Sequence, residues 1–571
     1  MSIARVAVVG AGLVGLALAR EIADRLPEAQ VTVFDKEDRI AAHQSGHTSG
    51  IVDSGLEEVP GSLGAAVSRR GVEKLVPYVS ERGIPYRECG QLFVAQDADD
   101  ADRLEEMLAR AAANGIPGVR LLDRGQMREI EPHARGVLAL YSPHTAVIDY
   151  PALAEALASD VRAAGGEFRL STEVTGIDVM ADEVRLRARS VSSGAGEATS
   201  DEAGSEDTKG GAEDVRVDPE DERSDADDIH VEPGDVRADR GVDEHLDEQV
   251  REVPHTYRGR DADPVIGLGD ELRSRFGEKD WFKQVEDTLD RWGEKISGAG
   301  HGTGTSEDSD TRRDSDAGRV GRDSGAEFGR THDAGHGTDD VRPAPQAAQP
   351  RSRSSRIPDE DAGSFDLVLV CAGLHADRLA EAAGLDPEPR IVPFTSDWFV
   401  ASEPDADAVH GIISSVPDPK APLTRTTLAR TVSGTLLLGP NTYPSLGREA
   451  YERRDVNFGD LSSTLGFKGF WKFASQNAKT AVRGAKSVVS TSAFVEGVQR
   501  FVPEIKAGAV KPGPRGVHAQ TIDSAGELRD ELIVTTRGRL TEVRNVPGWG
   551  ATSALAVAEH VADQALRAYT R

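Results

Sequence analysis

The chain has 571 residues, and its 97 acidic residues outnumber 67 basic ones, giving a formal net charge of −30 and a pI near 4.9. Such a chain repels nucleic acids and anionic membranes over most of its surface, which excludes a general nucleic-acid-binding role. Only 13 of the cations are lysine. The balance fits a protein kept soluble at high salt, where charge repulsion is screened, and we expect a halophilic source.

The cysteine content and the start of the chain indicate a cytoplasmic protein. Cys89 and Cys371 are the two cysteines, too few for a disulfide framework or a zinc site. The first predicted strand begins within five residues of Met1, which leaves no room for a signal peptide. No window approaches 18 consecutive apolar residues, so we expect no transmembrane helix.

The N-terminal segment predicts a dinucleotide-binding unit. Arg5 to Val9 is typical of a buried parallel strand, and it enters Gly10-x-Gly12-x-x-Gly15 before a helical run from Leu16 to Arg25. The first glycine permits the tight turn, the second lets backbone approach a pyrophosphate, and the third lets helix and strand pack closely. The N–H groups at the helix start then face an anion.

A second strand completes this unit. Val31 to Phe34 ends in Asp35, about 20 residues beyond the glycines, where an acceptor for a ribose hydroxyl belongs. The interpretation is specific because five features occur together: the strand, the glycines, the helix, the second strand and the acid at its end. They do not by themselves distinguish FAD from NAD.

Alternating helices and strands continue along the chain. Helices are predicted over 63–82, 99–114, 149–164, 374–383, 467–486 and 555–569. Strands are predicted over 91–95, 173–179, 183–188, 365–373, 390–402 and 434–438.

An acidic insertion interrupts this pattern. From Val191 to Glu360 there are 44 acidic and 23 basic residues, a net charge of −21, with few aliphatic residues and no sustained period. Such a segment cannot bury enough apolar surface to offset its ordering entropy, so it is predicted to be largely disordered. The strands on either side would be neighbours without it, which predicts that it emerges from a loop tip.

One island within the insertion has a helical pattern. Residues 270–296 place Phe276, Trp281 and Trp292 at near-helical spacing between charges. The segment could be a recognition helix that folds on a partner, or a helix that docks on the chain's own core.

Three small-residue turns favour FAD as the cofactor. Besides Gly10–Gly15, Cys371-Ala-Gly373 ends a buried strand, and Gly548-x-Gly550-Ala-Thr-Ser-Ala opens the last helix. The start of that helix would stabilise negative charge on a reduced flavin. A nicotinamide-binding domain does not need the C-terminal segment to come back to the cofactor in this way.

Further motifs make the chain resemble the FAD-dependent D-amino-acid-oxidase superfamily, and within it the L-2-hydroxyglutarate oxidases and dehydrogenases. The resemblance covers 1–190 and 365–571. Its motifs are His43-Gln-Ser-Gly-His47-Thr-Ser-Gly50, Pro60-Gly-Ser-Leu63, Glu88-Cys-Gly-Gln-Leu92, Ala113-Asn-Gly115, Pro143-His-Thr-Ala-Val-Ile-Asp-Tyr150, Cys371-Ala-Gly-Leu-His-Ala-Asp-Arg378, Arg390-Ile-Val-Pro-Phe394, Gly439-Pro-Asn441 and Arg448-Glu-x-Tyr451.

The resemblance implies an α/β (α+β) architecture with two domains. A Rossmann-type FAD-binding domain would comprise 1–60, 146–190, 365–389 and 536–571. An antiparallel-sheet substrate domain would comprise 61–145 and 390–535, with the insertion at 191–364. The implied cofactor-binding residues are Gly10, Gly12, Gly15, Asp35, Ser45, Gly46, Thr48, Ser49, Gly373, Gly548, Gly550 and Thr552.

The implied reaction is hydride transfer from a small 2-hydroxy acid, such as L-2-hydroxyglutarate, to flavin N5. The substrate motifs depart from the family pattern, however. Where the family usually has Val-Ile-His-x-Gly-x-Tyr-Tyr, this chain has Ile51-Val-Asp53-Ser-Gly55-Leu-Glu57-Glu58. Where the family usually has Pro-Phe-Arg-Gly-x-Tyr, this chain has Pro393-Phe-Thr395-Ser396-Asp397-Trp398. In the same way, Arg425-Thr-Thr427 stands where the family usually has Gly-Val-His. Gly516-Val-His518-Ala-Gln520 stands where it usually has Gly-Val-Arg-Ala-Gln. Cations and hydroxyls are lost at these positions, so the predicted substrate site differs from the family pattern while the cofactor motifs are kept.

The remaining candidates for substrate chemistry are few. Arg425, Arg430 and His518 could bind an anion, and His47 or His518 could act as the base. An equal alternative for His47 is that it only supports the loop that binds the flavin. His518 could be an ordinary strand residue. Asp53 is a further base candidate, because burial raises a carboxyl pKa.

The predicted helix over 467–486 holds four of the 13 lysines beside several aromatic residues. This helix could make peripheral contact with the membrane and pass electrons to quinone or another acceptor. Alternatively, it could be an amphipathic cap helix. Two alternative functions also stay open. One is an amino-acid or amine oxidase of the same superfamily, and the other is a flavin-bearing subunit with a degenerate active site.

Overall fold

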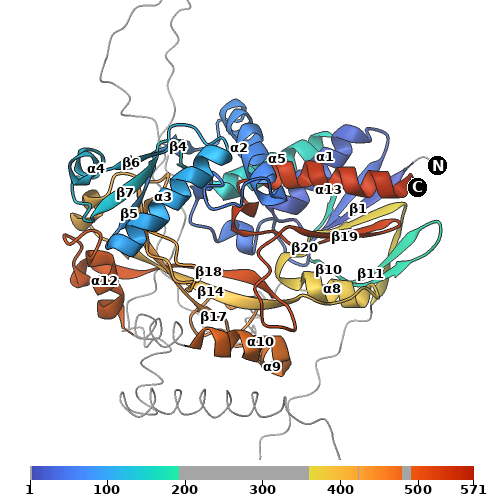
Figure 1. Ribbon diagram of the computed structural model, residues 1–571. Coiled ribbons are helices and arrows are strands. Elements are labelled where there is room, and N and C mark those ends of the chain that lie inside the picture. The colour runs from blue at the N-terminus through green and yellow to red at the C-terminus, as the bar shows by residue number, and fades with distance from the viewer. Residues whose placement is uncertain (1–2, 192–358, 422, 479–489, 571) are drawn as a thin grey trace, which may run out of the picture. The chain divides into compact units, whose positions relative to one another are not determined.

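The computed structural model describes residues 3–191, 359–421, 423–478 and 490–570, which form a mixed α/β fold (Figure 1). The expected fold class is confirmed, with one mainly parallel and one mainly antiparallel large sheet. Most of the insertion, the predicted helix over 270–296, and residues 479–486 of the predicted helix over 467–486 lie outside the described residues.

The first large sheet joins strands from the start, middle and end of the chain. Its order is β19 (Ile533–Arg537), β20 (Leu540–Asn545), β13 (Leu367–Val370), β1 (Arg5–Val9), β2 (Gln30–Phe34) and β9 (Glu167–Arg169). All neighbours are parallel except β19 and β20. Val9, the last residue of β1, pairs with both Phe34 and Val370, so these strands end at one edge.

Both faces of this sheet are covered, which explains the uninterrupted apolar run of β1. Val6 and Val8 pack on one side against α1 (Leu13–Arg25), α5 (Tyr150–Ala163) and α13 (Ala554–Tyr569). Figure 1 shows α13, in red, beside α1. Ala7 and Val9 pack on the other side against β10 (Thr172–Val179), β11 (Val184–Ser190) and β12 (Glu360–Phe365). The first helix begins at Leu13, one turn before the predicted Leu16.

The insertion joins two paired strands. β11 and β12 are antiparallel, and Ala188 lies opposite Glu360. Residues 360–364, which the sequence analysis assigned to the insertion, are therefore part of the fold. Their Gly-Ser-Asp-rich composition hid the strand, because pairing with β11 and not the local pattern holds them extended. The predicted strand over 365–373 is correspondingly two strands, β12 and β13.

The second large sheet has eight strands. Its order is β18 (Val510–Ile522), β14 (Arg390–Ala401), β17 (Leu436–Pro444), β16 (Thr427–Arg430), β15 (Ile412–Ser415), β5 (Gln91–Ala95), β7 (Leu138–Ser142) and β6 (Arg120–Leu122). One neighbouring pair, β15 and β5, is parallel, which the expectation of an antiparallel sheet did not include. This pair joins the segment before residue 145 to the segment after residue 390.

The described part of the predicted helix over 467–486 buries its aromatic residues. It contains α10 (Lys468–Gln476), preceded by α9 (Phe458–Gly466). Phe467, Phe470 and Phe473 pack with Val392 and Phe394 of β14. This packing favours the cap-helix interpretation over peripheral membrane contact, because the three phenylalanine rings are buried in the core. No helix among the described residues is both long and apolar enough to cross a membrane.

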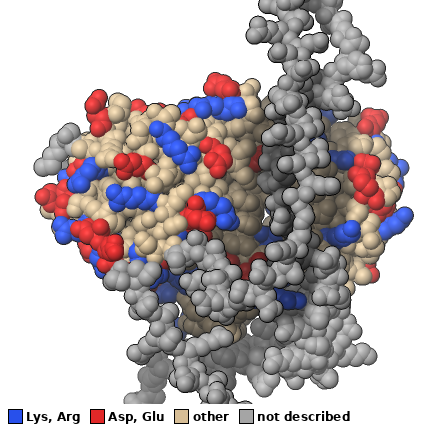
Figure 2. All heavy atoms as spheres, turned by 180° about the vertical axis from the view of Figure 1, so that it is seen from behind, with Lys and Arg blue, Asp and Glu red and all other residues tan. Residues whose placement is uncertain are grey.

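One face of the described residues has mixed charge. On the face shown in Figure 2, acidic and basic side chains are interspersed and not gathered by sign. This agrees with the sequence, in which 191–360 carries −21 of the net charge of −30.

Replacing residues 192–358 by a short Asn-Gly turn should leave the fold intact, because β11 and β12 then form an ordinary hairpin. We expect a melting temperature within a few degrees of the full chain and the same flavin content after purification. A second deletion that also removes Glu360–Ser364 should lower both, since it takes away the strand itself. Equal losses in the two variants would contradict the hairpin interpretation.

Candidate active site

One cavity of about 850 Å³ collects the three predicted turns. It is lined by Gly10, Gly12 and Gly15 from the turn between β1 and α1, and by Cys371 to Leu374 after β13. Gly548, Gly550 and Ala551, at the start of α13, lie on the same cavity. Segments more than 500 residues apart therefore share one binding space.

The turn after β1 leaves no room for side chains. Gly10 has a φ of 109°, and a Cβ placed on it would lie 2.3 Å from the carbonyl oxygen of Cys371. A Cβ on Gly15 would lie 1.9 Å from the carbonyl oxygen of Gly10. Gly15 thus brings helix and strand together as predicted, while Gly12 borders the cavity.

Polar groups around this turn suit a dinucleotide. The backbone N–H groups of Ala11 and Glu37 donate to the Asp35 carboxylate at 2.6 and 2.9 Å, which fixes it on the cavity. The start of α1 presents backbone to the same space, so the positive end of the helix faces an anion. The glycine backbone and the start of the helix fit the pyrophosphate of FAD, and the fixed acid fits its ribose.

Most of the predicted cofactor-binding residues line the cavity. Ser45 does so and also accepts the N–H of Leu13 at 2.9 Å, so it caps α1. Two of the predicted residues do not. Gly46 packs against the Ala41 carbonyl, and Thr552 is buried behind the cavity, where it accepts the N–H of Asp53 at 2.9 Å. Spacing along a loop could not reveal which residues face inward.

The other half of the cavity is formed by side chains of the eight-stranded sheet. Hydroxyl and amide groups form a chain there, in which Gln91 donates to Ser414 at 3.0 Å and Ser414 lies 3.1 Å from Thr427. Phe93, Ser396, Trp398 and His518 are further sheet residues that line the cavity. This half offers a small polar substrate specific contacts.

His518 faces the cavity from β18. Its Nδ1 lies 3.3 Å from the Ser396 hydroxyl, and in the tautomer in which Nδ1–H donates, Nε2 carries the lone pair. Burial lowers the pKa of His518 to about 4, so the ring is neutral at pH 7. A neutral imidazole on a cavity wall can accept a proton.

His47 is held more tightly. Its Nδ1 lies 3.0 Å from the carbonyl oxygen of Arg515, and its ring stacks on Tyr451 with centroids 4.1 Å apart. Burial lowers the pKa of His47. It lines the cavity, but these contacts favour support of the flavin loop over proton transfer.

The two predicted anion-binding arginines have different surroundings. Arg425 lines the cavity, and its guanidinium donates to Glu57 at 2.5 Å. Arg430 does not line it. Its guanidinium bonds Asp407 at 3.1 Å and the Gly434 carbonyl at 3.1 Å, so the proposed substrate role of Arg430 does not fit the geometry. Arg425 precedes β16 (Thr427–Arg430), whereas Arg430 is the last residue of that strand.

Acidic groups surround Arg425. Asp53, Glu57 and Asp530 line the cavity there, and Glu58 lies close to Asp53. Burial and repulsion from Glu57 raise the pKa of Asp53 and of Asp530. Burial and repulsion from Asp53 raise the pKa of Glu58 to about 7. Sequence reasoning missed Asp530, because nothing in its local sequence connects it to residues 53–58.

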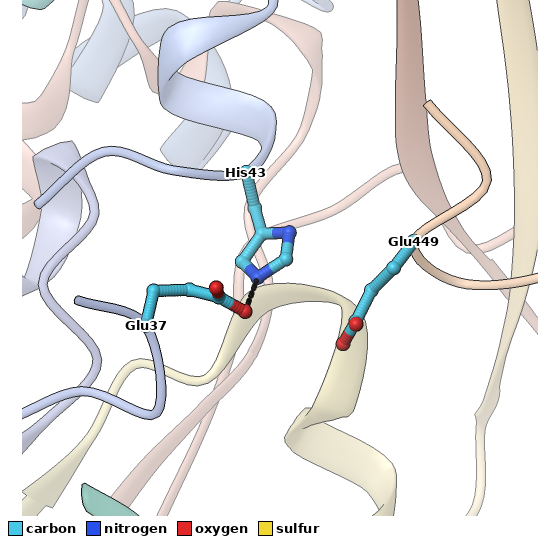
Figure 3. A group of neighbouring side chains, drawn as sticks. All are labelled: Glu37, His43 and Glu449. Carbon is cyan, nitrogen blue, oxygen red and sulfur yellow. Dashed lines mark hydrogen bonds and ion pairs between the residues drawn. The ribbon is translucent and has the colours of Figure 1, made fainter. Parts of the chain in front are cut away.

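A second group of side chains, Glu37, His43 and Glu449, has ligand atoms close enough to hold a metal ion (Figure 3). His43 Nε2 lies 2.9 Å from Glu37. Lys36 already bridges the two carboxylates, with its Nζ bonded to Glu37 and 2.7 Å from Glu449. Burial alone would lower the pKa of Lys36, but these carboxylates outweigh it and raise the pKa. The ammonium supplies the positive charge that a metal would bring, so the group is an ion-pair cluster.

Comparison with known proteins identifies the fold and the cofactor. Residues 5–203 match the family model DAO, described as FAD dependent oxidoreductase. The chain is 26% identical to L-2-hydroxyglutarate dehydrogenase, mitochondrial, from Nematostella vectensis, over 99% of this chain and 91% of that protein. The corresponding human protein is 25% identical, with 98% and 88% covered, and an Escherichia coli L-2-hydroxyglutarate dehydrogenase is 21% identical, with 98% and 92% covered.

Solved structures share the fold at lower identity. L-alpha-glycerophosphate oxidase from Mycoplasma pneumoniae with FAD bound gives a TM-score of 0.56 at 13% identity, covering 100% of this chain and 95% of the other. Glycine oxidase from Geobacillus kaustophilus gives 0.52 at 14% identity, covering 99% and 95%. These two likenesses agree with the expected fold class.

Gly15→Ala should destabilise the protein by about 1–3 kcal/mol and lower its FAD content, because the new methyl group overlaps the Gly10 carbonyl. Gly497→Ala is the matched control. Gly497 lies within α12 (Thr491–Gln499) with open space around its Cα, and alanine there should be neutral or stabilising by up to about 1 kcal/mol. Thermal melting and the flavin-to-protein absorbance ratio measure both effects. Equal melting temperatures for the two variants would contradict the close packing.

Proposed function

We propose that this enzyme oxidises a small 2-hydroxy acid to the 2-oxo acid, since residues 5–203 match the DAO family model, described as FAD dependent oxidoreductase. L-2-hydroxyglutarate, the compound in the names of the sequence relatives, is the reference substrate. The observation that carries the proposal is that Arg425 and His518 line the same cavity. A cation and a neutral proton acceptor are what such a substrate requires.

The proposed reaction removes a hydride from the carbon that carries the hydroxyl and a proton from the hydroxyl oxygen. FAD, when bound, supplies the two-electron acceptor at its N5. Arg425 donates hydrogen bonds to the substrate carboxylate, and Glu57 fixes the guanidinium for that purpose. His518 accepts the hydroxyl proton at Nε2, while Ser396 holds the other ring nitrogen. Quinone or another acceptor then takes up the electrons.

A 2-amino acid is the second candidate substrate, favoured by the carboxylates near Arg425. Asp53 and Asp530 would attract an ammonium group, and neither suits a second substrate carboxylate. The chemistry at the substrate carbon is the same, the loss of a hydride and a proton.

Anaerobic mixing of the purified enzyme with 2-hydroxy acids should bleach the flavin absorbance near its long-wavelength maximum. A set of 2-amino acids, tested in the same way, separates the two substrate classes. Bleaching by 2-amino acids alone would replace the first candidate by the second. No bleaching by either class, with activity regained on adding a cell fraction, would favour a flavin-bearing subunit instead.

His518→Gln should lower kcat by about 10²–10⁴-fold without loss of FAD, because it removes the proton acceptor. His144→Gln is the matched control, since His144 is exposed and pairs with Glu88 outside the cavity. The pH profile gives a second measurement. A His518 pKa of about 4 keeps the ring neutral, so kcat/KM should persist as the pH falls from 7 to about 5. A fall centred near the ordinary histidine pKa of about 6.5 would exclude His518 as the base.

A further inference from the structure

The strand that carries His518 lies at the edge of its sheet. β18 is the first strand of the eight-stranded sheet, so β14 is its single neighbour there among the described strands. Ala519 lies opposite Pro393 of β14, and proline has no N–H, so these two residues cannot exchange a pair of hydrogen bonds. The N–H of Ala519 points away from β14 and needs an acceptor outside the sheet.

The loop after β2 meets this edge on both sides of the proposed base. The side-chain oxygen of Gln44, Oε1, accepts the N–H of Ala519 at 3.0 Å. His47 Nδ1 lies 3.0 Å from the carbonyl oxygen of Arg515. Gly516 lies so close to the loop that a Cβ on it would be 2.8 Å from the carbonyl oxygen of His47. Side chains of the loop therefore bind the strand edge in the way that another strand would.

The same part of the loop also contacts the glycine turn after β1. Gln44 and Ser45 are consecutive residues of the short helix η1 (Gln44–Gly46). The Ser45 hydroxyl accepts the N–H of Leu13, and a Cβ on Gly12 would lie 3.1 Å from that hydroxyl oxygen. One turn of chain thus contacts the start of α1 with one side chain and β18 with the side chain before it. The two sides of the cavity are connected through η1.

The Gln44 side chain has little room to move away from β18. Gly373, which follows β13, has a φ of 48°, and a Cβ on it would lie 2.9 Å from Nε2 of Gln44. The amide is therefore enclosed between the end of β13 and the edge of β18. Its oxygen faces the N–H of Ala519, and an acceptor held in this way keeps the strand at one distance from the loop.

We propose that Gln44 is a positioning residue for His518, because its hydrogen bond to Ala519 fixes the backbone that carries the imidazole. The inference rests on the proposed function, in which His518 accepts the hydroxyl proton. Ser396 orients the ring itself, whereas Gln44 sets where the ring stands relative to the glycine turn. The proton and the hydride leave neighbouring atoms of the substrate, so the base must keep one separation from the cofactor.

Two substitutions of Gln44 test the hydrogen bond without any substrate. Methionine in Gln44→Met has a similar length but no acceptor, whereas Gln44→Glu keeps an oxygen at the same place. In the FAD-loaded full chain, the Ala519 amide should exchange with deuterium about tenfold faster in Gln44→Met, and Gln44→Glu should stay within about threefold of the unsubstituted chain. Mass spectrometry of the peptide that contains Ala519 measures both rates. Unchanged exchange in Gln44→Met would overturn the inference.

Anaerobic flavin reduction, with L-2-hydroxyglutarate and 2-hydroxybutanoate as probes, tests the effect on catalysis. Gln44→Met should lower the rate constant at saturating acid about 10–100-fold and change the half-saturating concentration less than about twofold. Its FAD-to-protein ratio should be that of the unsubstituted chain. Gln44→Glu should recover most of the rate, because the acceptor is kept. Gln476→Met, at an exposed position of α10 outside the cavity, is the matched control and should leave the rate unchanged.

A double-mutant cycle decides whether Gln44 acts through His518. In the His518→Gln chain, Gln44→Met should change the remaining rate less than about twofold, because no base is left to be positioned. Gly516→Ala separates loop and strand from the side of β18 and should show the same dependence on His518. Equal fold-changes with and without His518 would overturn the inference and leave the proposed function standing. No flavin reduction by either acid in the unsubstituted chain would overturn both.

Discussion

The structure depends on one close backbone contact, that between the turn after β1 and the end of β13. Gly10 lies against the Cys371 carbonyl and Gly15 against the Gly10 carbonyl, at separations that exclude any Cβ. These contacts set the distance between α1 and the parallel sheet and leave backbone N–H groups at the cavity. The ends of β1 and β13 and the start of α13 can then border one ligand.

The two halves of the cavity are built on different physical terms. The cofactor half consists mainly of backbone, glycine and one fixed acid, so its chemistry is determined by how closely the main chain can approach phosphate. The other half, on the eight-stranded sheet, is lined by side chains from β5, β14, β15, β16 and β18, so single substitutions change its chemistry. This difference explains how the chain can keep its glycine-rich cofactor motif while residues such as Asp53 and His518 depart from the pattern of the family that the sequence resembles.

Charge is distributed unevenly in this protein on two scales. Along the chain, most of the net negative charge belongs to 191–360, and the face of the described residues in Figure 2 has interspersed charges. Within the cavity, carboxylates gather around Arg425. At the other cluster, Lys36 pairs with Glu37 and Glu449, the two carboxylates drawn in Figure 3. Each cluster therefore has its own cation, Arg425 in the first and Lys36 in the second.

The sequence by itself determined the β1–α1–β2 unit, the cofactor and the position of the insertion, because each depends on local pattern: apolar runs, glycine spacing and a sharp change in composition. Tertiary structure alone decided which side chains share the cavity. It turned Arg430 away and brought Asp530 to Asp53, two residues 477 positions apart. It also held Glu360–Ser364 in a strand and directed three phenylalanines of the 467–486 segment inward. Strand pairing over long separations set these positions, and no local pattern encodes it.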